Sequence, residues 1–142
     1  MNRSKTSVSF YLSWIVSSLT MFCLSYAWHG LFLNDLLKIN YPLDVFLLIS
    51  GLVYPGIGFI ITLVTFFAPR IKDSFKYGIA AGGAIGIFVY VIAFVVGISF
   101  YPKLSLTMVA VDVSWQCFEQ GIGGLISGLI YRISYRKSRA LA

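Results

Sequence analysis

The stretch that decides the fold is Val111–Gly124, VDVSWQCFEQGIGG, which sets two acids and two amides inside an otherwise apolar run. These four side chains follow an i, i+4, i+7, i+8 spacing, so a helix would carry all of them on one face: Asp112, Gln116, Glu119 and Gln120. A face of this kind is costly in contact with lipid. The stretch therefore predicts a helix that packs its polar face against other helices.

The rest of the chain is apolar enough to supply those helices. Of its 142 residues, 58% are hydrophobic and only 11% are charged, whereas soluble domains carry about 25% charged residues. An α-helix needs roughly 20 apolar residues to cross a bilayer, and four runs exceed that length: residues 8–33, 43–68, 77–100 and 104–131. We expect a single all-α domain, a bundle of four transmembrane helices.

The basic residues indicate how the bundle is oriented. Nine of the eleven precede the first run, lie between the second and third, or follow the fourth, and the other two are Lys38 and Lys103. Because cytoplasmic loops are enriched in Lys and Arg, both termini are expected in the cytoplasm. This distribution favours membrane topology over nucleic-acid binding. The basic tail, residues 132–142, is expected to lie against anionic lipid headgroups.

Small residues at helical spacing predict close helix contacts. The third run places glycines four residues apart, and the fourth run repeats that spacing below its polar stretch: Gly78, Gly82 and Gly86, then Gly124 and Gly128. The first run has a stripe of small and polar residues, from Ser9 through Ser13, Ser17, Met21 and Ser25 to His29. Such faces usually pack inward, where the helix backbones can approach one another.

The acids of the fourth run can be assigned a depth. At a rise of 1.5 Å per residue, Asp112 lies about 13 Å and Glu119 about 24 Å below Lys103, so Glu119 is near the midplane. A central Asp costs about 2.5–3.5 kcal/mol to insert, and each Leu, Ile, Val or Phe returns only about 0.3–0.6 kcal/mol. This helix is therefore expected to be marginal alone and to need partners within the bundle.

His29 is the best partner that the sequence offers for Asp112, since it lies near the same depth on the first helix. We expect a polar pocket in the outer half of the bundle, with Asp44 at its mouth and the four polar residues of the fourth helix along its wall. Three interpretations compete: structural pairing between helices, a site for ligand binding or proton-coupled transport, and metal or haem ligation by His29. A single histidine makes a metal site sparse, so no metal or cofactor is expected.

Two motifs carry a resemblance to a known group of proteins. The chain has a Trp-His pair near the end of the first helix, in AWHGLFLND, and an Asp-x-x-Trp-x-x-x-Glu-Gln-Gly run in the fourth. In both it resembles a family of small four-helix bacterial membrane proteins, a resemblance that spans most of the chain and implies no activity. Members commonly have His where this chain has Gln116, which disfavours a paired-histidine metal site here.

These observations favour ligand binding or proton-coupled transport in the pocket, with Glu119 or Asp112 exchanging a proton. The alternative is a non-catalytic accessory or scaffold subunit whose polar residues only lock helices together. Association with a second copy or with another membrane subunit is compatible with both. An enzyme is less favoured, because the sequence shows no nucleophile–base pair or metal motif.

Overall fold

The described part of the protein folds into four α-helices and one π-helical turn. In the computed structural model, residues 3–33, 42–68, 70, 74–97 and 105–140 are described. Their helices are α1 (Arg3–Tyr26), η1 (Ala27–Phe32), α2 (Leu43–Phe67), α3 (Lys76–Gly97) and α4 (Leu106–Ala140), where η1 is the π-helical turn. No strand occurs within these ranges. The prediction of an all-α fold with four long helices is confirmed.

Three of the helical segments are long and apolar enough to cross a membrane: Ser7–Phe32, Leu43–Phe67 and Lys76–Val95. Helix α4 is not among them, although its 35 residues would span about 52 Å. The reason lies in its composition, because acids and amides interrupt its apolar half and basic residues occupy its end. This agrees with the expectation that the fourth helix is marginal without its neighbours.

The helix boundaries follow the apolar runs except at two places. The first helix, expected over residues 8–33, begins at Arg3 and changes to a π-helix at Ala27. The fourth, expected to end at 131, continues to Ala140, so most of the predicted tail is helical. Hydropathy marks where an apolar run ends, whereas Arg, Lys and Ala are themselves good helix formers. Helix α4 therefore extends beyond the end of the apolar run.

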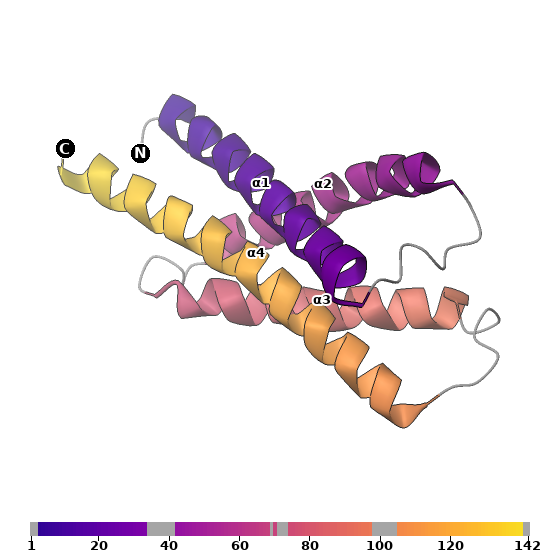
Figure 1. The fold of residues 1–142 in the computed structure, drawn as a ribbon. Helices are drawn as coiled ribbons and strands as arrows, with labels where there is room; N and C mark the ends of the chain where they lie inside the picture. Colours follow the sequence, from indigo (N-terminus) through magenta and orange to yellow (C-terminus); the bar gives the residue numbers. More distant parts are fainter. Residues whose placement is uncertain (1–2, 34–41, 69, 71–73, 98–104, 141–142) are drawn as a thin grey trace.

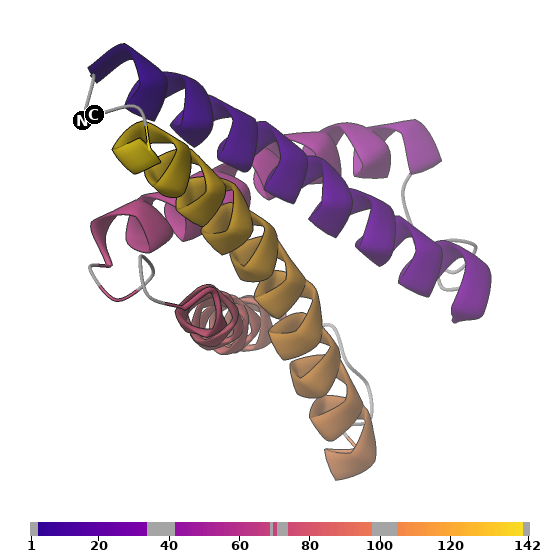
Figure 2. The same ribbon diagram turned by 90° about the vertical axis from the view of Figure 1, so that its left-hand side faces the viewer.

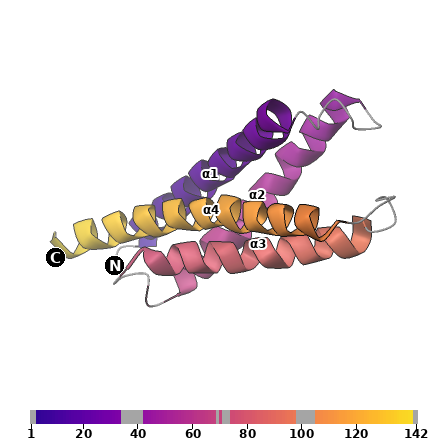
Figure 3. The same ribbon diagram turned by 60° about the horizontal axis from the view of Figure 1, so that its bottom comes forward.

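The four helices form two antiparallel pairs. Helix α4 lies against α3 over the most extensive interface of the molecule, and α1 contacts both α2 and α4, whereas α2 and α3 touch little. Figure 1 shows both termini at the same end of the bundle, and Figure 2, turned by 90°, shows them side by side. Toward the opposite end, the α1–α2 pair diverges from the α3–α4 pair (Figure 3). Helix α4 is thus the element that joins the two pairs.

Glycines on α3 set how closely α4 approaches. A Cβ atom on Gly82 would overlap the carbonyl oxygen of Gln120, and one on Gly86 would overlap the carbonyl oxygen of Gln116. A Cβ on Gly78 would meet the carbonyl oxygen of Gly124 in the same way. The two backbones are therefore in direct contact over three helical turns, as the glycine spacing predicts.

The glycines of α4 contribute unequally to this contact. Gly124 meets the backbone of Gly78 so closely that no side chain would fit, whereas a Cβ on Gly128 would lie 3.5 Å from the carbonyl oxygen of Phe75. That second distance is an ordinary van der Waals contact. The close approach therefore requires Gly124 but not Gly128.

The stripe predicted on the first helix also packs inward. Ser9, Ser13, Ser17 and Met21 are buried on α1, and the Ser9 hydroxyl donates to the Ser134 hydroxyl of α4 at 2.6 Å. Two turns earlier on α4, the hydroxyls of Thr62 and Ser127 lie 3.1 Å apart and join α2 to α4. Polar pairs of this kind typically add about 0.6 kcal/mol each between membrane helices.

Candidate functional site

Glu119 is the centre of the candidate site. Its side chain is 0% exposed, and among the buried side chains of the described residues it is the only charged one. It lies on α4 one residue before Gln120, whose backbone is held against Gly82 of α3. The glycine contact therefore fixes both the position and the rotation of the helix that carries the carboxylate.

Two donors to this carboxylate come from α4 itself. The indole Nε1 of Trp115, one turn earlier, donates to Oε2 of Glu119 at 2.9 Å. The amide Nε2 of Gln120, which is also 0% exposed, donates to Oε1 at 3.1 Å. Each carboxylate oxygen thus has a donor from its own helix, and hydrogen bonds to an ionised group are worth about 1.5–3 kcal/mol.

Two further partners come from other helices. The hydroxyl groups of Ser25 on α1 and Tyr54 on α2 both hydrogen-bond to the Glu119 side chain, and they also hydrogen-bond to each other. Helix α2 is held at this level by Trp14 of α1, whose Nε1 donates to the carbonyl oxygen of Pro55 at 2.7 Å. Glu119 therefore lies where three helices meet, and the next residue after Tyr54 is anchored to α1.

The electrostatics of the site are unusual because all four side chains that hydrogen-bond to Glu119 are neutral. Burying an isolated carboxylate costs far more than burying a neutral polar group, and such a group requires pairing, hydrogen bonds or neutralisation. Here the four partners supply hydrogen bonds to Glu119, but none of them carries a positive charge. The arrangement is suited to a carboxyl group that takes up a proton or a small cation.

A small hollow lies beside the Glu119 partners, between α1 and α2. Seven residues line it, and they include both hydroxyl residues that contact Glu119: Phe22, Ser25, Tyr26, Phe46, Leu47, Ser50 and Tyr54. The cavity has a volume of about 10 Å³, which is roughly the space that one water molecule needs. The hollow therefore brings water-sized space up to Ser25 and Tyr54.

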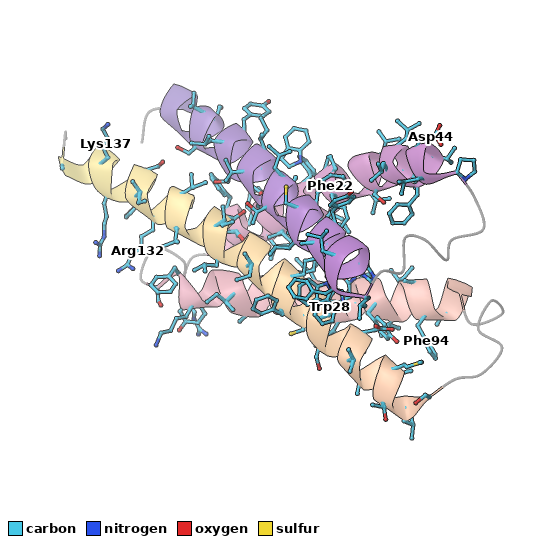
Figure 4. The ribbon with its side chains drawn as sticks, in the orientation of Figure 1. Phe22, Trp28, Asp44, Phe94, Arg132 and Lys137 are labelled. Atoms are coloured by element: carbon cyan, nitrogen blue, oxygen red, sulfur yellow. The ribbon has the colours of Figure 1, made fainter. Side chains whose placement is uncertain are left out.

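An aromatic stack connects the site to η1. The indole of Trp28 lies parallel to that of Trp115, with ring centroids 4.2 Å apart and an interplanar angle of 8°. Figure 4 shows Trp28 where the end of the first helix meets α4. Trp115 thus uses its ring face to hold η1 and its N–H group to hold Glu119. A shift of η1 would therefore move Trp115 and change its hydrogen bond to the Glu119 carboxylate.

The predicted pair of His29 and Asp112 lies on the same two elements. His29 follows Trp28 in η1 and Asp112 precedes Trp115 by three residues on α4, and both side chains are half-buried. The Trp28–Trp115 stack brings the two turns together. A direct contact between His29 and Asp112 stays a prediction.

Two further residues were predicted for the pocket, Gln116 and Asp44. Gln116 is half-buried, and its carbonyl oxygen forms part of the contact with Gly86. Asp44 is exposed in the first turn of α2, and Figure 4 shows it at the outer end of that helix, well apart from Trp28. Phe46 and Leu47, which follow Asp44 by two and three residues, line the hollow, and the position of Asp44 at the mouth of a pocket stays a prediction.

Sequence reasoning did not assign three of the four partners of Glu119: Trp115, Tyr54 and Ser25. Trp115 had a usable signal, since it precedes Glu119 by four residues on the same helix and such residues are neighbours on the helix surface. Ser25 had a weaker one, its place on the inward stripe of α1. Tyr54 had only its neighbour Pro55 to distinguish it.

Comparison of the chain with protein-family models, with curated proteins and with solved structures finds no significant match.

Proposed function

We propose that the protein is a multi-pass protein of the bacterial inner membrane with both termini in the cytoplasm. Three apolar helical segments of sufficient length support this, and so does the collection of nine of the eleven basic residues on one side of the predicted spans. Helix α4 spans as the fourth helix because its polar face is covered by α1, α2 and α3. Anionic lipid headgroups face the basic end of α4.

The topology is tested with C-terminal reporters. A fluorescent protein fused after Ala142 should fluoresce, and alkaline phosphatase at the same place should be inactive, because the first folds in the cytoplasm and the second outside it. The same two reporters placed after Tyr101 should give the opposite result. Active phosphatase at the C-terminus would contradict the orientation.

We further propose that Glu119 exchanges a proton during the binding or transport of a small ligand. One observation carries this proposal: a fully buried carboxyl group at the junction of three helices has only neutral hydrogen-bonding partners. Ionisable residues inside a membrane bundle mark ion pathways and proton relays. Here Ser25 and Tyr54 both line the hollow and contact the carboxyl group, so their hydroxyls offer a route by which a proton reaches Glu119.

Replacing Glu119 by Gln tests this function. Gln keeps the size of the side chain and an acceptor oxygen for Trp115 or Tyr54, so the unfolding midpoint in detergent should change little. A pH-dependent signal of ligand binding or transport should disappear, because an amide exchanges no proton in this range. The midpoint is measured by thermal unfolding and the function by pH change inside liposomes.

The alternative is an accessory subunit in which Glu119 only ties helices together. The tight backbone contact of α3 with α4 and the small size of the hollow favour this second reading. It predicts that Glu119→Gln causes a large loss of folded protein with no separable activity. That result would replace the transport proposal.

A further inference from the structure

We propose that Glu119 and Gln120 together bind a dehydrated monovalent metal cation, Na⁺, in competition with the proton at Glu119. This inference rests on the proposed function, in which Glu119 exchanges its charge state, and it names the ion that alternates with the proton. The oxygens that would surround the ion come from Glu119, Gln120, Tyr54 and Ser25.

The observation that points to a cation is an unsatisfied oxygen. Gln120 is 0% exposed, its amide nitrogen donates to Glu119, and its amide oxygen Oε1 is buried without a hydrogen-bond partner. A buried acceptor left without a partner costs about 1–3 kcal/mol. The site therefore holds unused acceptor capacity on the residue next to the carboxylate.

The geometry allows that oxygen to face the carboxylate. The terminal amide of Gln120 can turn about its last torsion, which exchanges the positions of its nitrogen and oxygen. The turned oxygen would lie about 3.1 Å from Oε1 of Glu119, where the nitrogen lies now. Two oxygens this close repel each other unless a cation lies between them. Hard cations bind oxygens at about 2.3–2.6 Å, and two ligands of one ion then lie roughly 3–3.6 Å apart.

Charge and space select the class of ion. Glu119 is the only charged side chain among the buried ones described, so one positive charge balances the site and two would not. The Gln120 backbone is pinned by Gly82, and a Cβ on Gly86 would lie 3.0 Å from Cγ of Gln120. The Gln120 side chain therefore has little room to move back for a large ion. Na⁺ has nearly the radius of Ca²⁺, for which the oxygen distances above hold.

The hollow provides the way in. Ser25 and Tyr54 line it and also contact Glu119, so an ion that leaves its water in the hollow meets hydroxyl oxygens before it meets the carboxylate. The space for about one water molecule is large enough for a dehydrated ion.

The test is protection of Glu119 from a hydrophobic carbodiimide, which modifies protonated carboxyl groups within membranes. The full-length protein in detergent is labelled at constant pH and ionic strength in choline chloride or NaCl, and the label on Glu119 is measured by mass spectrometry. Na⁺ should slow labelling at least tenfold with saturation. KCl should protect much less, and Glu119→Gln should remove the labelled peptide.

Two variants assign the ion ligand. Gln120→Met removes the amide at similar volume, and labelling should persist at near the wild-type rate while Na⁺ protection is lost. Ser127→Ala removes another buried polar group of α4, from its contact with Thr62, and should keep Na⁺ protection. Because Gln120→Met could unfold the protein, wild-type labelling in the series of salts stands as an independent measurement.

The outcomes separate this inference from the function beneath it. Labelling that varies with pH but is equal in NaCl and choline chloride overturns the Na⁺ site and leaves proton exchange standing. Absence of label on Glu119 at every pH overturns proton exchange and the Na⁺ site together. Na⁺ protection that survives in folded Gln120→Met overturns the role of Gln120.

Discussion

Two neighbouring turns of α4, at Gly124 and at Gln120, both make close backbone contacts with α3, but the contacts serve different purposes. At the glycine end, Gly124 meets Gly78 backbone to backbone. One turn closer to the N-terminus of α4, Gln120 makes an equally close backbone contact with Gly82, yet its side chain turns to Glu119. The first region uses closeness for packing alone. In the second region the close contact also fixes the position of the buried pair of Gln120 and Glu119. The glycine contact is therefore part of the site.

The largest expected effect comes from breaking that contact. Gly82→Ala sets a methyl group against the carbonyl oxygen of Gln120, and a backbone cannot move aside as a side chain can. We expect a loss of about 3 kcal/mol in unfolding free energy, the upper end of the usual range for overpacking, together with loss of ligand or ion binding. Thermal unfolding in detergent measures the first effect and binding the second.

The matched control for this change is Gly51→Ala on α2. No atom lies within 4 Å of a Cβ built there, so the variant should be neutral or gain up to about 1 kcal/mol from helix propensity. Equal losses from the two substitutions would show that glycine content, rather than the α3–α4 contact, sets the stability. The link between packing and site would then be broken.

A smaller effect is expected from Trp115→Phe. This change removes the N–H donor to Oε2 of Glu119 and keeps an aromatic ring against Trp28. We expect the free energy of unfolding to fall by about 2 kcal/mol, as for loss of a hydrogen bond to a charged group. We also expect an altered pH dependence of binding. Unfolding midpoints and binding titrations at several pH values measure the two.

Its counterpart, Trp28→Leu, removes the stack and leaves the donors of Glu119 in place. An aromatic pair is worth about 0.5–1.5 kcal/mol beyond its buried area, so the stability loss should be smaller and the pH dependence unchanged. If Trp28→Leu altered the pH dependence as much as Trp115→Phe, the Trp28–Trp115 stack would itself influence the protonation of Glu119.

The helix packing could be predicted from the sequence because spacing alone carries it. Gly78, Gly82 and Gly86 recur every four residues, and that spacing has one meaning on a helix. The same logic placed Glu119 and Gln120 on the inward face of α4. In each case the residues that interact, or that share a face, lie on one helix, so the angle between them is known in advance.

The partners of Glu119 from other helices could not be predicted in this way. Ser25 and Tyr54 reach it only because α1 and α2 have a particular rotation and height relative to α4. A pattern at α-helical spacing also does not reveal that η1 is a π-helix, which changes the direction of the residues from Ala27 to Phe32. The divergence of the α1–α2 pair from the α3–α4 pair is likewise a property of the assembled helices.

The shared indole of Trp115 has a practical consequence. Its ring is stacked on Trp28 at 4.2 Å while its nitrogen is bonded to the Glu119 carboxylate, so two of the three tryptophans of the chain form one coupled chromophore. A change of charge on Glu119 alters the electric field at that chromophore. The protein therefore contains its own optical probe, and near-ultraviolet circular dichroism can follow occupation of the site without any label.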